Sequence, residues 1–195
     1  MATHATCLWT TATVRAHVGI TDAGDTTKDA ILERIANGVT AFMERYTRRM
    51  FVTRSRTETR DGDGSKILFL DYFPVTALTS VKIVRSPEGT QETVAASSYT
   101  QNLDIGKVYL HSDVLNKGVG NVEVVYSTGY GAQGATTLPL DINEIGLQLV
   151  KMLFTEETVG AAGQSSITIG AHTISINPSW PKQIKDTLEH WRRAY

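Results

Sequence analysis

The fold is set by the stretch from Ile31 to Arg60, which reads ILERIANGVTAFMERYTRRMFVTRSRTETR. From Phe51 the period of this stretch changes to two, and Thr or Ser alternates with Arg or Glu through residues 53–60. Neither face of that strand is apolar, so we expect an edge strand. Before Phe51, apolar residues recur at helical spacing and predict one continuous buried face, formed by Ile31, Leu32, Ile35, Val39, Phe42, Met43 and Tyr46.

The two ends of this helix also have sequence signals. Thr26, followed three residues later by Asp29, resembles a capping box and predicts the start. Arg48 or Arg49 marks the predicted end, because cations suit the negative end of the helix dipole. A helix joined directly to a period-two region indicates an α+β fold.

Further short strands are predicted after residue 60. Asp61–Gly64 reads as a turn, from which residues 66–70 are expected to return beside residues 53–60. A second turn is predicted at Pro87–Gly89. The remaining predicted strands lie at residues 80–85, 99–103, 107–111 and 121–127. This spacing favours a small antiparallel sheet or sandwich.

Helices are predicted on both sides of the β-region. One covers residues 12–18, one begins at Pro139, and a last one begins near Pro181. A β-hairpin at residues 165–176, turning across residues 170–173, separates the last two. We therefore expect a small helical bundle built from residues 1–50 and 136–195, with the β-region inserted at residues 51–135. The stripe expected to be buried on the helix after Pro139 is Ile142, Ile145, Leu149, Met152 and Leu153; on the last helix it is Ile184, Leu188 and Trp191.

Composition limits the classes of function. The chain has 195 residues, 41% hydrophobic and 20% charged, with a net charge of −1. A balance so near zero argues against a dedicated nucleic-acid binder, which needs an excess of Lys and Arg. Cys7 is the single cysteine, so no disulfide within the chain is expected. No secretory signal or span of about 18 apolar residues is seen, and we expect a soluble protein that is made in the cytosol.

Motifs for chemistry fail on their context. Gly129–Gly134 matches GxGxxG, but residues 136–138 separate it from the helix that a dinucleotide site would require, which favours a glycine-rich loop. Asp61–Ser65 resembles a calcium loop, yet Lys66 and Tyr72 stand where glycine and glutamate are needed. We expect no enzyme, cofactor or metal centre. The histidines are scattered without ligand spacing at His4, His17, His111, His172 and His190.

Three segments are candidates for interaction. A basic concentration could meet DNA phosphates or an acidic partner, or could be a solvated helix end and strand; it comprises Arg45, Arg48, Arg49, Arg54, Arg56 and Arg60. The end of the chain has the Trp, Arg and Tyr composition of interface anchors, although Trp191 also continues the apolar stripe. The hairpin needs a partner, because an isolated two-stranded hairpin is marginal in water; its candidate contacts are Ile167, Ile169, Ile174 and Ile176.

The order of these segments resembles the head–tail connector, or adaptor, family of long-tailed bacteriophages and gene-transfer particles. The most characteristic piece is Phe73-Pro74-Val75-Thr76-Ala77-Leu78-Thr79-Ser80-Val81. It is preceded by residues 44–51 and 57–70, and followed by Tyr126–Gly131, Leu138–Ile142 and the helix from Pro181 to Tyr195. The resemblance covers most of the chain from about Thr10 onward.

The resemblance implies a structural subunit of the virion neck without catalytic residues. Members form a ring, commonly of twelve subunits, under the portal protein and next to stopper or tail-terminator proteins, and genomic DNA passes through the lumen without sequence-specific binding. It assigns portal or subunit contact to Trp191, Arg192, Arg193 and Tyr195. Arg54, Arg56 and Arg60 are candidates for contact with DNA in the lumen or with a neighbour.

Three alternatives stay open at this point. The first is a tail-completion protein, which has the same structural character. The second is a DNA-binding module that uses the surface from Arg45 to Arg60. The third is an enzyme that binds a cofactor at the Gly129–Gly134 loop.

Overall fold

The computed structural model describes residues 4–22, 24–84, 89–158, 166–169, 172–175 and 181–192. The chain divides into two compact units. One, called here the helical unit, comprises Met1–Arg48 and Gly131–Tyr195. The other, the β unit, comprises Arg49–Tyr130.

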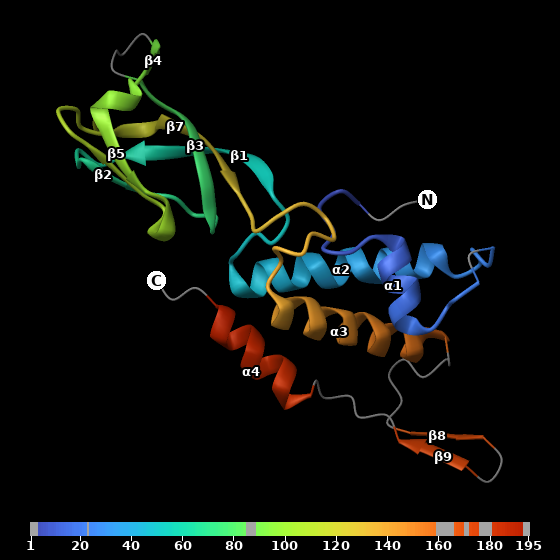
Figure 1. Ribbon diagram of the computed structural model, residues 1–195. Coiled ribbons are helices and arrows are strands. Elements are labelled where there is room, and N and C mark those ends of the chain that lie inside the picture. Colours follow the sequence, from blue (N-terminus) through green and yellow to red (C-terminus); the bar gives the residue numbers. More distant parts are fainter. Residues whose placement is uncertain are drawn as a thin grey trace. The chain divides into compact units, whose positions relative to one another are not determined.

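Within the described residues, the helical unit holds four α-helices, and α2 and α3 each contact the other three (Figure 1). They are α1 (Thr11–Val18), α2 (Asp29–Thr47), α3 (Leu140–Thr158) and α4 (Lys182–Trp191). Their apolar stripes form the core as the spacing predicts, with Leu32, Met43, Ile142, Leu149 and Ile184 all buried. Met152 and Leu153, expected in the stripe of α3, are only half-buried.

Close packing in this core depends on Gly146 of α3. A Cβ at this position would lie 2.4 Å from Cη2 of Trp9 and 3.0 Å from Sδ of Met43. The indole therefore lies directly on the backbone of α3, and its Nε1 donates to Asn143 Oδ1 at 2.7 Å. Any side chain at residue 146 would displace the indole.

The capping prediction for α2 is wrong at its start and confirmed at its end. The helix begins at Asp29, and Lys28 occupies the N-cap without a side-chain hydrogen bond. The carboxylate of Asp25 instead accepts from the backbone N and Oγ1 of Thr27, at 3.1 and 2.6 Å, so the turn before the helix is closed locally. At the other end Arg48 has a left-handed backbone, with φ of 57°, and stops the helix.

The β unit contains two antiparallel sheets. The larger has the strand order β1-β7-β3-β4 and the smaller the order β2-β6-β5. The strands are β1 (Arg54–Gly62), β2 (Ile67–Phe69), β3 (Val75–Val84), β4 (Gln91–Thr93), β5 (Tyr99–Asn102), β6 (Lys107–Leu110) and β7 (Gly118–Thr128). Short 3-10 turns at Ala96–Ser98 and Leu103–Ile105 flank β5.

Both sheets contribute to one apolar core, which confirms the sandwich. From β7 come Val122, Val124 and Tyr126, the face that the alternation predicts, and all are fully buried. From the smaller sheet come Leu68 and Val108. The inserted β-region thus has a hydrophobic core of its own.

The pairing expected for residues 66–70 is wrong. Residues 61–64 do turn the chain, but β2 pairs with β6 in the smaller sheet, with Ile67 opposite Tyr109. β1 pairs with β7 instead and lies at the edge of the larger sheet, as its polar alternation predicts. The pattern did not predict β4, because all three of its residues are exposed.

The hairpin between α3 and α4 is confirmed. β8 (Ser166–Ile169) pairs antiparallel with β9 (His172–Ser175), which puts Ile167 opposite Ile174. Ile176 lies outside the described residues. With helices and antiparallel sheets in separate parts of the sequence, the chain has the α+β fold expected from its change of period.

Candidate interaction surfaces

The end of α4 is attached to the bundle by polar contacts. Nε1 of Trp191 donates to Asp141 Oδ2 at 2.5 Å, and Oη of Tyr46 donates to Glu189 Oε2 at 2.6 Å. The hydrogen bond from Tyr46 lowers the pKa of Glu189, since it stabilises the carboxylate. Trp191 is half-buried, so part of its side chain packs in the bundle and part is exposed at the surface.

Arg192 follows as an exposed cation next to this contact. Its Nη1 lies 3.2 Å from Oε1 of Glu189, and its guanidinium lies 5.8 Å from the ring centroid of Tyr46. Both contacts are at the surface and therefore weak, so a partner's carboxylate could replace them at little cost. Arg193 and Tyr195, also expected to contact a partner, lie outside the described residues.

The hairpin candidates are placed by backbone register. Ile167 and Ile169 lie on β8 and Ile174 on β9, in a sheet of two strands. Ile169 pairs with His172 across the ladder. Among the described residues each of these strands pairs only with the other, so within that part of the chain each leaves one edge of backbone N–H and C=O groups for a further strand.

The β1 arginines point toward the core side of their strand. Arg56 pairs with Tyr126 and Arg60 with Val122, whose side chains are in the sandwich core, and directly paired residues share a face. The guanidinium of Arg56 lies 4.4 Å from the ring centroid of Tyr72. Nε of Arg54 lies 3.1 Å from Sδ of Met50. The apolar stems of these arginines thus pack against residues of the β unit on the core side of β1.

Glu58 is the buried charge of β1. Its carboxylate accepts from the hydroxyl of Tyr126 and, at 3.2 Å, from the backbone N of Asp71. Arg60 forms ion pairs with both Glu58 and Asp71. Burial, and then the hydrogen bond to Glu58, raise the pKa of Tyr126 far above its usual value, so this hydroxyl stays protonated.

The remaining arginines of the basic stretch have different environments. Nη1 of Arg49 donates to Oη of Tyr130 at 3.2 Å, and its guanidinium lies 5.7 Å from the ring centroid of Phe73. Arg45 and Arg48 are exposed. The stretch from Arg45 to Arg60 is therefore not one uniform basic face, and its β1 members already have partners within the β unit.

The glycines of the Gly129–Gly134 segment serve close backbone packing. Gly129 has φ of 125°, and a Cβ there would lie 2.5 Å from the Cα of Thr53. A Cβ on Gly131 would lie 2.1 Å from Oγ1 of Thr137. The segment ends several residues before α3 begins at Leu140, so its glycines do not open a helix as a dinucleotide site requires.

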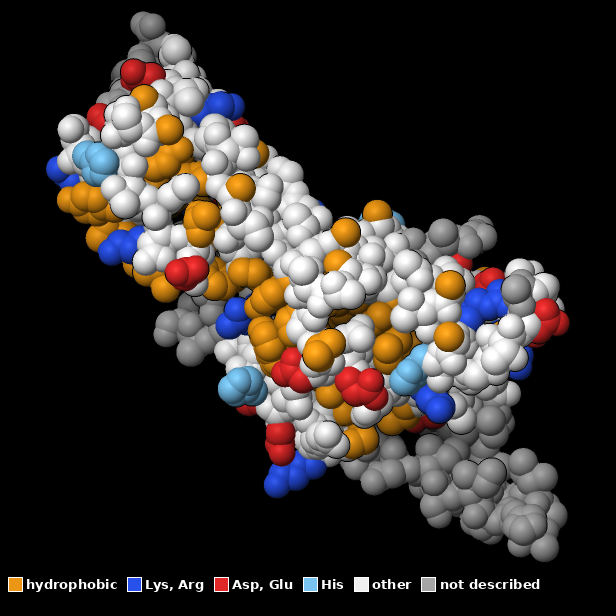
Figure 2. Space-filling view, in the orientation of Figure 1, with side chains coloured by type: hydrophobic (Ala, Val, Ile, Leu, Met, Phe, Trp, Pro, Cys, Tyr) orange, Lys and Arg blue, Asp and Glu red, His pale blue; other side chains and the backbone are white. Residues whose placement is uncertain are grey.

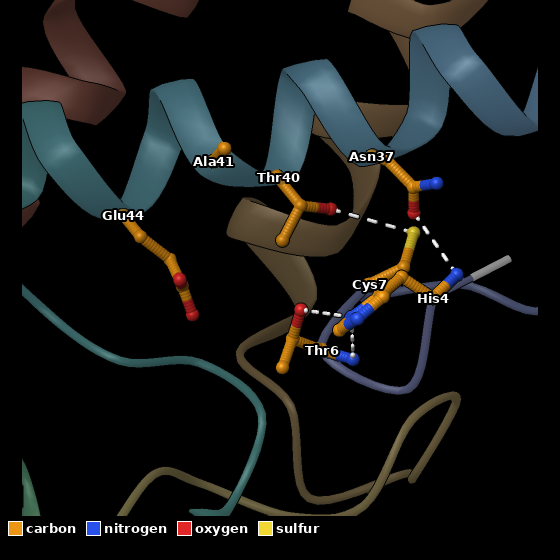
Figure 3. A pocket seen from close by; sticks show the side chains of 7 residues that line it. All are labelled: His4, Thr6, Cys7, Asn37, Thr40, Ala41 and Glu44. Carbon is orange, nitrogen blue, oxygen red and sulfur yellow. Dashed lines mark hydrogen bonds between the residues drawn. The ribbon is translucent and has the colours of Figure 1, made fainter.

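Cys7 lines a pocket of the helical unit (Figure 3). Its side chain is buried, with Sγ 3.5 Å from Oγ1 of Thr40. Burial raises the pKa of the thiol, which therefore stays protonated and poorly nucleophilic. His4 and Asn37 lie beside it, linked by a hydrogen bond of 3.2 Å from the His4 backbone N.

No group of three or more His, Cys, Asp or Glu side chains within the described ranges could hold a metal ion. The helices of those ranges are also too short or too polar to cross a membrane.

Sequence reasoning missed an apolar outer surface on the smaller sheet. Ile67, Phe69 and Tyr109 are exposed there, in strands whose alternate residues are buried. The signal was the uninterrupted apolar run of residues 67–70, which is typical of a strand covered on both faces.

Comparison with known proteins places this geometry in a family. Solved structures of gene transfer agent particles have the same fold. A chain of the native virion has a TM-score of 0.68 and 20% identity, and the match covers 100% of this chain and 94% of that chain. A chain of the neck of an empty particle, computed with sixfold symmetry, has a TM-score of 0.67 and 19% identity, with 95% of this chain and 89% of that chain covered. A chain of the neck of a native particle, computed with twelvefold symmetry, has a TM-score of 0.63 and 19% identity, with 94% of this chain and 88% of that chain covered. The search of curated proteins gave no significant match. The family model described as head completion protein matches residues 8–194. This chain belongs to the head completion protein family.

Proposed function

We propose that this chain is a non-catalytic subunit of a ring in the virion neck. The ring lies under the portal protein, extends the DNA channel and links the filled head to the stopper or tail-terminator proteins. The observation that carries the proposal is the match to neck subunits of gene transfer agent particles over 94% or more of this chain, combined with membership of the head completion protein family. The two units are both included in that match.

The proposed ring has twelve copies. The twelvefold symmetry of one matched neck supports this number, and the sixfold symmetry of the other is compatible with it. A ring of identical subunits needs two different contact patches on each copy, because every neighbour contact is head-to-tail. The chain would be made in the host cytoplasm and become part of the virion neck on assembly.

Two segments are proposed for partner contact. The end of the chain, with Trp191, Arg192, Arg193 and Tyr195, is assigned to the portal protein, supported by the exposed position of Arg192. The hairpin, with Ile167, Ile169, Ile174 and Ile176, is assigned to a neighbouring subunit, supported by its two-stranded sheet. A two-stranded hairpin gains stability when a third strand or an apolar surface covers it.

DNA is proposed to pass the ring without strong binding. A net charge of −1 suits a channel that lets phosphates move. Arg54, Arg56 and Arg60 would have to leave Met50, Tyr72 and the acidic groups near Glu58 in order to reach a phosphate. The proposal therefore assigns these arginines to the sandwich and not to the channel wall.

The test is assembly of the full chain, alone and on heads. Purified protein would be imaged by negative-stain electron microscopy, and then added to filled heads made by cells that lack this gene. We expect rings in solution or on the portal vertex, and heads that join tails after addition. Protein that stays monomeric in both samples contradicts the proposal. Binding at the end of an isolated tail would show a tail-completion protein instead, and salt-dependent retention on duplex DNA would show a DNA-binding module.

A further inference from the structure

In the smaller sheet of the β unit, β2 is apolar on both faces, and Tyr109 of β6 lies beside it on the outer face, whereas β5 presents Thr100 and Asn102 there. The inner residues of the sheet, such as Leu68 and Val108, belong to the sandwich core. On the outer face, Phe69 is 55% exposed, Tyr109 42% and Ile67 36%. An antiparallel sheet with one face in water normally alternates apolar and polar residues, so the apolar outer residues of β2 and Tyr109 indicate that this part of the outer face is covered by a partner.

Exposed apolar side chains are concentrated on this sheet. Within the described ranges, seven large hydrophobic side chains are exposed, and five belong to the smaller sheet or to the segments next to its strands: Ile67, Phe69, Ile105, Tyr109 and Val114. Figure 2 shows hydrophobic side chains gathered over the end of the β unit where Figure 1 labels β2 and β5. Such a contiguous patch, with polar groups at its rim, is typical of a protein interface.

Two lysines give this patch a basic rim. Lys107 pairs with Phe69 across the ladder, and its Nζ lies 5.9 Å from the ring centroid of Phe69. Lys66 precedes β2, and its Nζ donates to the backbone O of His111 at 3.0 Å. We call the patch formed by Ile67, Phe69 and Tyr109 with these lysines the sheet patch.

The helical unit carries a patch of complementary character. Leu140, the first residue of α3, is 79% exposed, and it is the one large exposed hydrophobic side chain of that unit within the described ranges. Asp141 and Glu144, also exposed, follow it in the first turn and a half of the helix. Asp141 accepts a hydrogen bond from Nε1 of Trp191 and Glu144 one from Nε2 of Gln148, and both donors leave the carboxylate charges in place. We call these three residues the helix patch; it pairs an apolar side chain with negative charge.

We propose that the sheet patch of one copy binds the helix patch of the next copy in the ring. The inference rests on the proposed ring function. A head-to-tail ring needs two unlike patches on each chain, and this chain has one apolar patch with lysines and one with carboxylates. The apolar side chains supply the buried centre, and the charges at the rim select the partner and the register.

The first test removes the apolar centre and keeps the strands. Phe69→Thr and Tyr109→Thr retain a side chain suited to a strand, and both positions are exposed, so folding should be unchanged by circular dichroism and thermal melting. The concentration at which half of the protein is in rings should rise about tenfold or more. Val119→Thr is the matched control, because Val119 is 92% exposed in the same unit but lies on β7.

The second test traps the contact itself. Phe69→Cys chains and Leu140→Cys chains, both carrying Cys7→Ser, would be mixed, assembled and oxidised. Disulfide dimers should form in the mixture and not in either variant alone, since the contact joins unlike patches.

The outcomes separate this inference from the proposed function. Rings that form at wild-type concentration in the Phe69→Thr and Tyr109→Thr variants, with no dimers from the mixture, overturn the patch pairing and leave the ring intact. Wild-type protein that forms rings neither in solution nor on heads overturns both. Loss of rings in Val119→Thr to the same degree would show that assembly responds to any lost apolar surface, which also contradicts the pairing.

Discussion

β1 and β2 are both edge strands of the β unit, β1 in the larger sheet and β2 in the smaller, but β1 exposes polar side chains to water and β2 exposes apolar ones. β1 exposes Thr57 and Thr59 and turns charged side chains, among them Glu58, toward the core side of the sandwich. β2 exposes Ile67 and Phe69 and buries Leu68. One edge therefore has apolar contacts to offer, and the other does not.

The difference shows how one sandwich can have one edge that resists the addition of a further strand and another that offers apolar side chains to a partner. Charges that point inward prevent a foreign strand from pairing with an edge, because the added strand would have to cover them. On β1 the carboxylate of Glu58 is paired with the guanidinium of Arg60 and accepts a hydrogen bond from the hydroxyl of Tyr126. On β2 no comparable charge lies inside the strand, and its outer apolar residues remain for a partner.

The largest effect is expected from removing the charge that protects β1. Glu58→Ala leaves the Tyr126 hydroxyl and the Asp71 backbone N without their acceptor and should cost about 3 kcal/mol of unfolding free energy. Urea denaturation of the full chain measures it. Glu58→Gln keeps an acceptor of the same size and should cost clearly less. Equal stability of Glu58→Ala and wild type would mean that the inward charge contributes nothing to this edge.

A pH effect of the same cluster comes next. The pKa of Tyr126 is raised in the folded chain, whereas the pKa of a tyrosine in the unfolded chain is about 10. The folded state thus binds this proton more tightly, so its stabilisation is complete below about pH 10 and is lost as the pH rises above that value. Relative to Tyr126→Phe, wild type should lose about 1.4 kcal/mol for each pH unit above 10. Parallel pH curves for the two proteins would contradict the assignment.

Much of this fold was predictable from local patterns. The helix that contains Ile35 and Val39 and the strand that contains Val124 have strong periodicity and a buried face, so burial and spacing agree. The start of α2 was not predictable, because the spacing of Thr26 and Asp29 does not show that Thr27 and Asp25 close the preceding turn with a hydrogen bond of their own.

The pairing of β2 and the role of the β1 arginines depend on contacts between residues far apart in sequence. β2 is next to β1 in the chain, but it pairs with β6, and the two are separated by β3 and β4 of the larger sheet and by β5. The alternation of residues 53–60 made Arg56 a candidate for DNA contact. It does not indicate that the guanidinium of Arg56 packs on the ring of Tyr72. A charge in an alternating strand can face either water or a polar cluster, and the pattern is the same in both cases.

A smaller effect is expected where the chain leaves the β1 edge. The backbone N of Gly62 donates to Asn121 Oδ1 at 2.7 Å, and Nδ2 of Asn121 donates to the backbone O of Asn116 at 2.6 Å. Asn121→Ala should cost about 1 kcal/mol, the net value of a typical hydrogen bond, by urea denaturation. Asn116→Ala, which keeps its carbonyl oxygen, is the matched control. A loss in Asn116→Ala as large as in Asn121→Ala would show that the amide bridge does not fix this end of β1.

The smallest effect on stability should accompany an exchange of character between the two edges. Thr57→Val with Thr59→Val gives β1 an apolar outer face, and Ile67→Thr with Phe69→Thr gives β2 a polar one; all four positions are exposed in strands. Each double variant should stay within about 0.5 kcal/mol of wild type in urea, because exposed substitutions that suit a strand change few buried contacts.

Self-association, measured by light scattering against concentration, should change far more than stability. The β2 variant should assemble less than wild type, since two of the three apolar side chains of the sheet patch, Ile67 and Phe69, are replaced. The β1 variant should gain at most weak association, because the inward charges at Glu58 and Arg60 still oppose strand addition at that edge. Strong aggregation of the β1 variant would mean that outer polarity, and not the inward charge, protects β1, and the contrast between the two edges would then reduce to side-chain hydrophobicity alone.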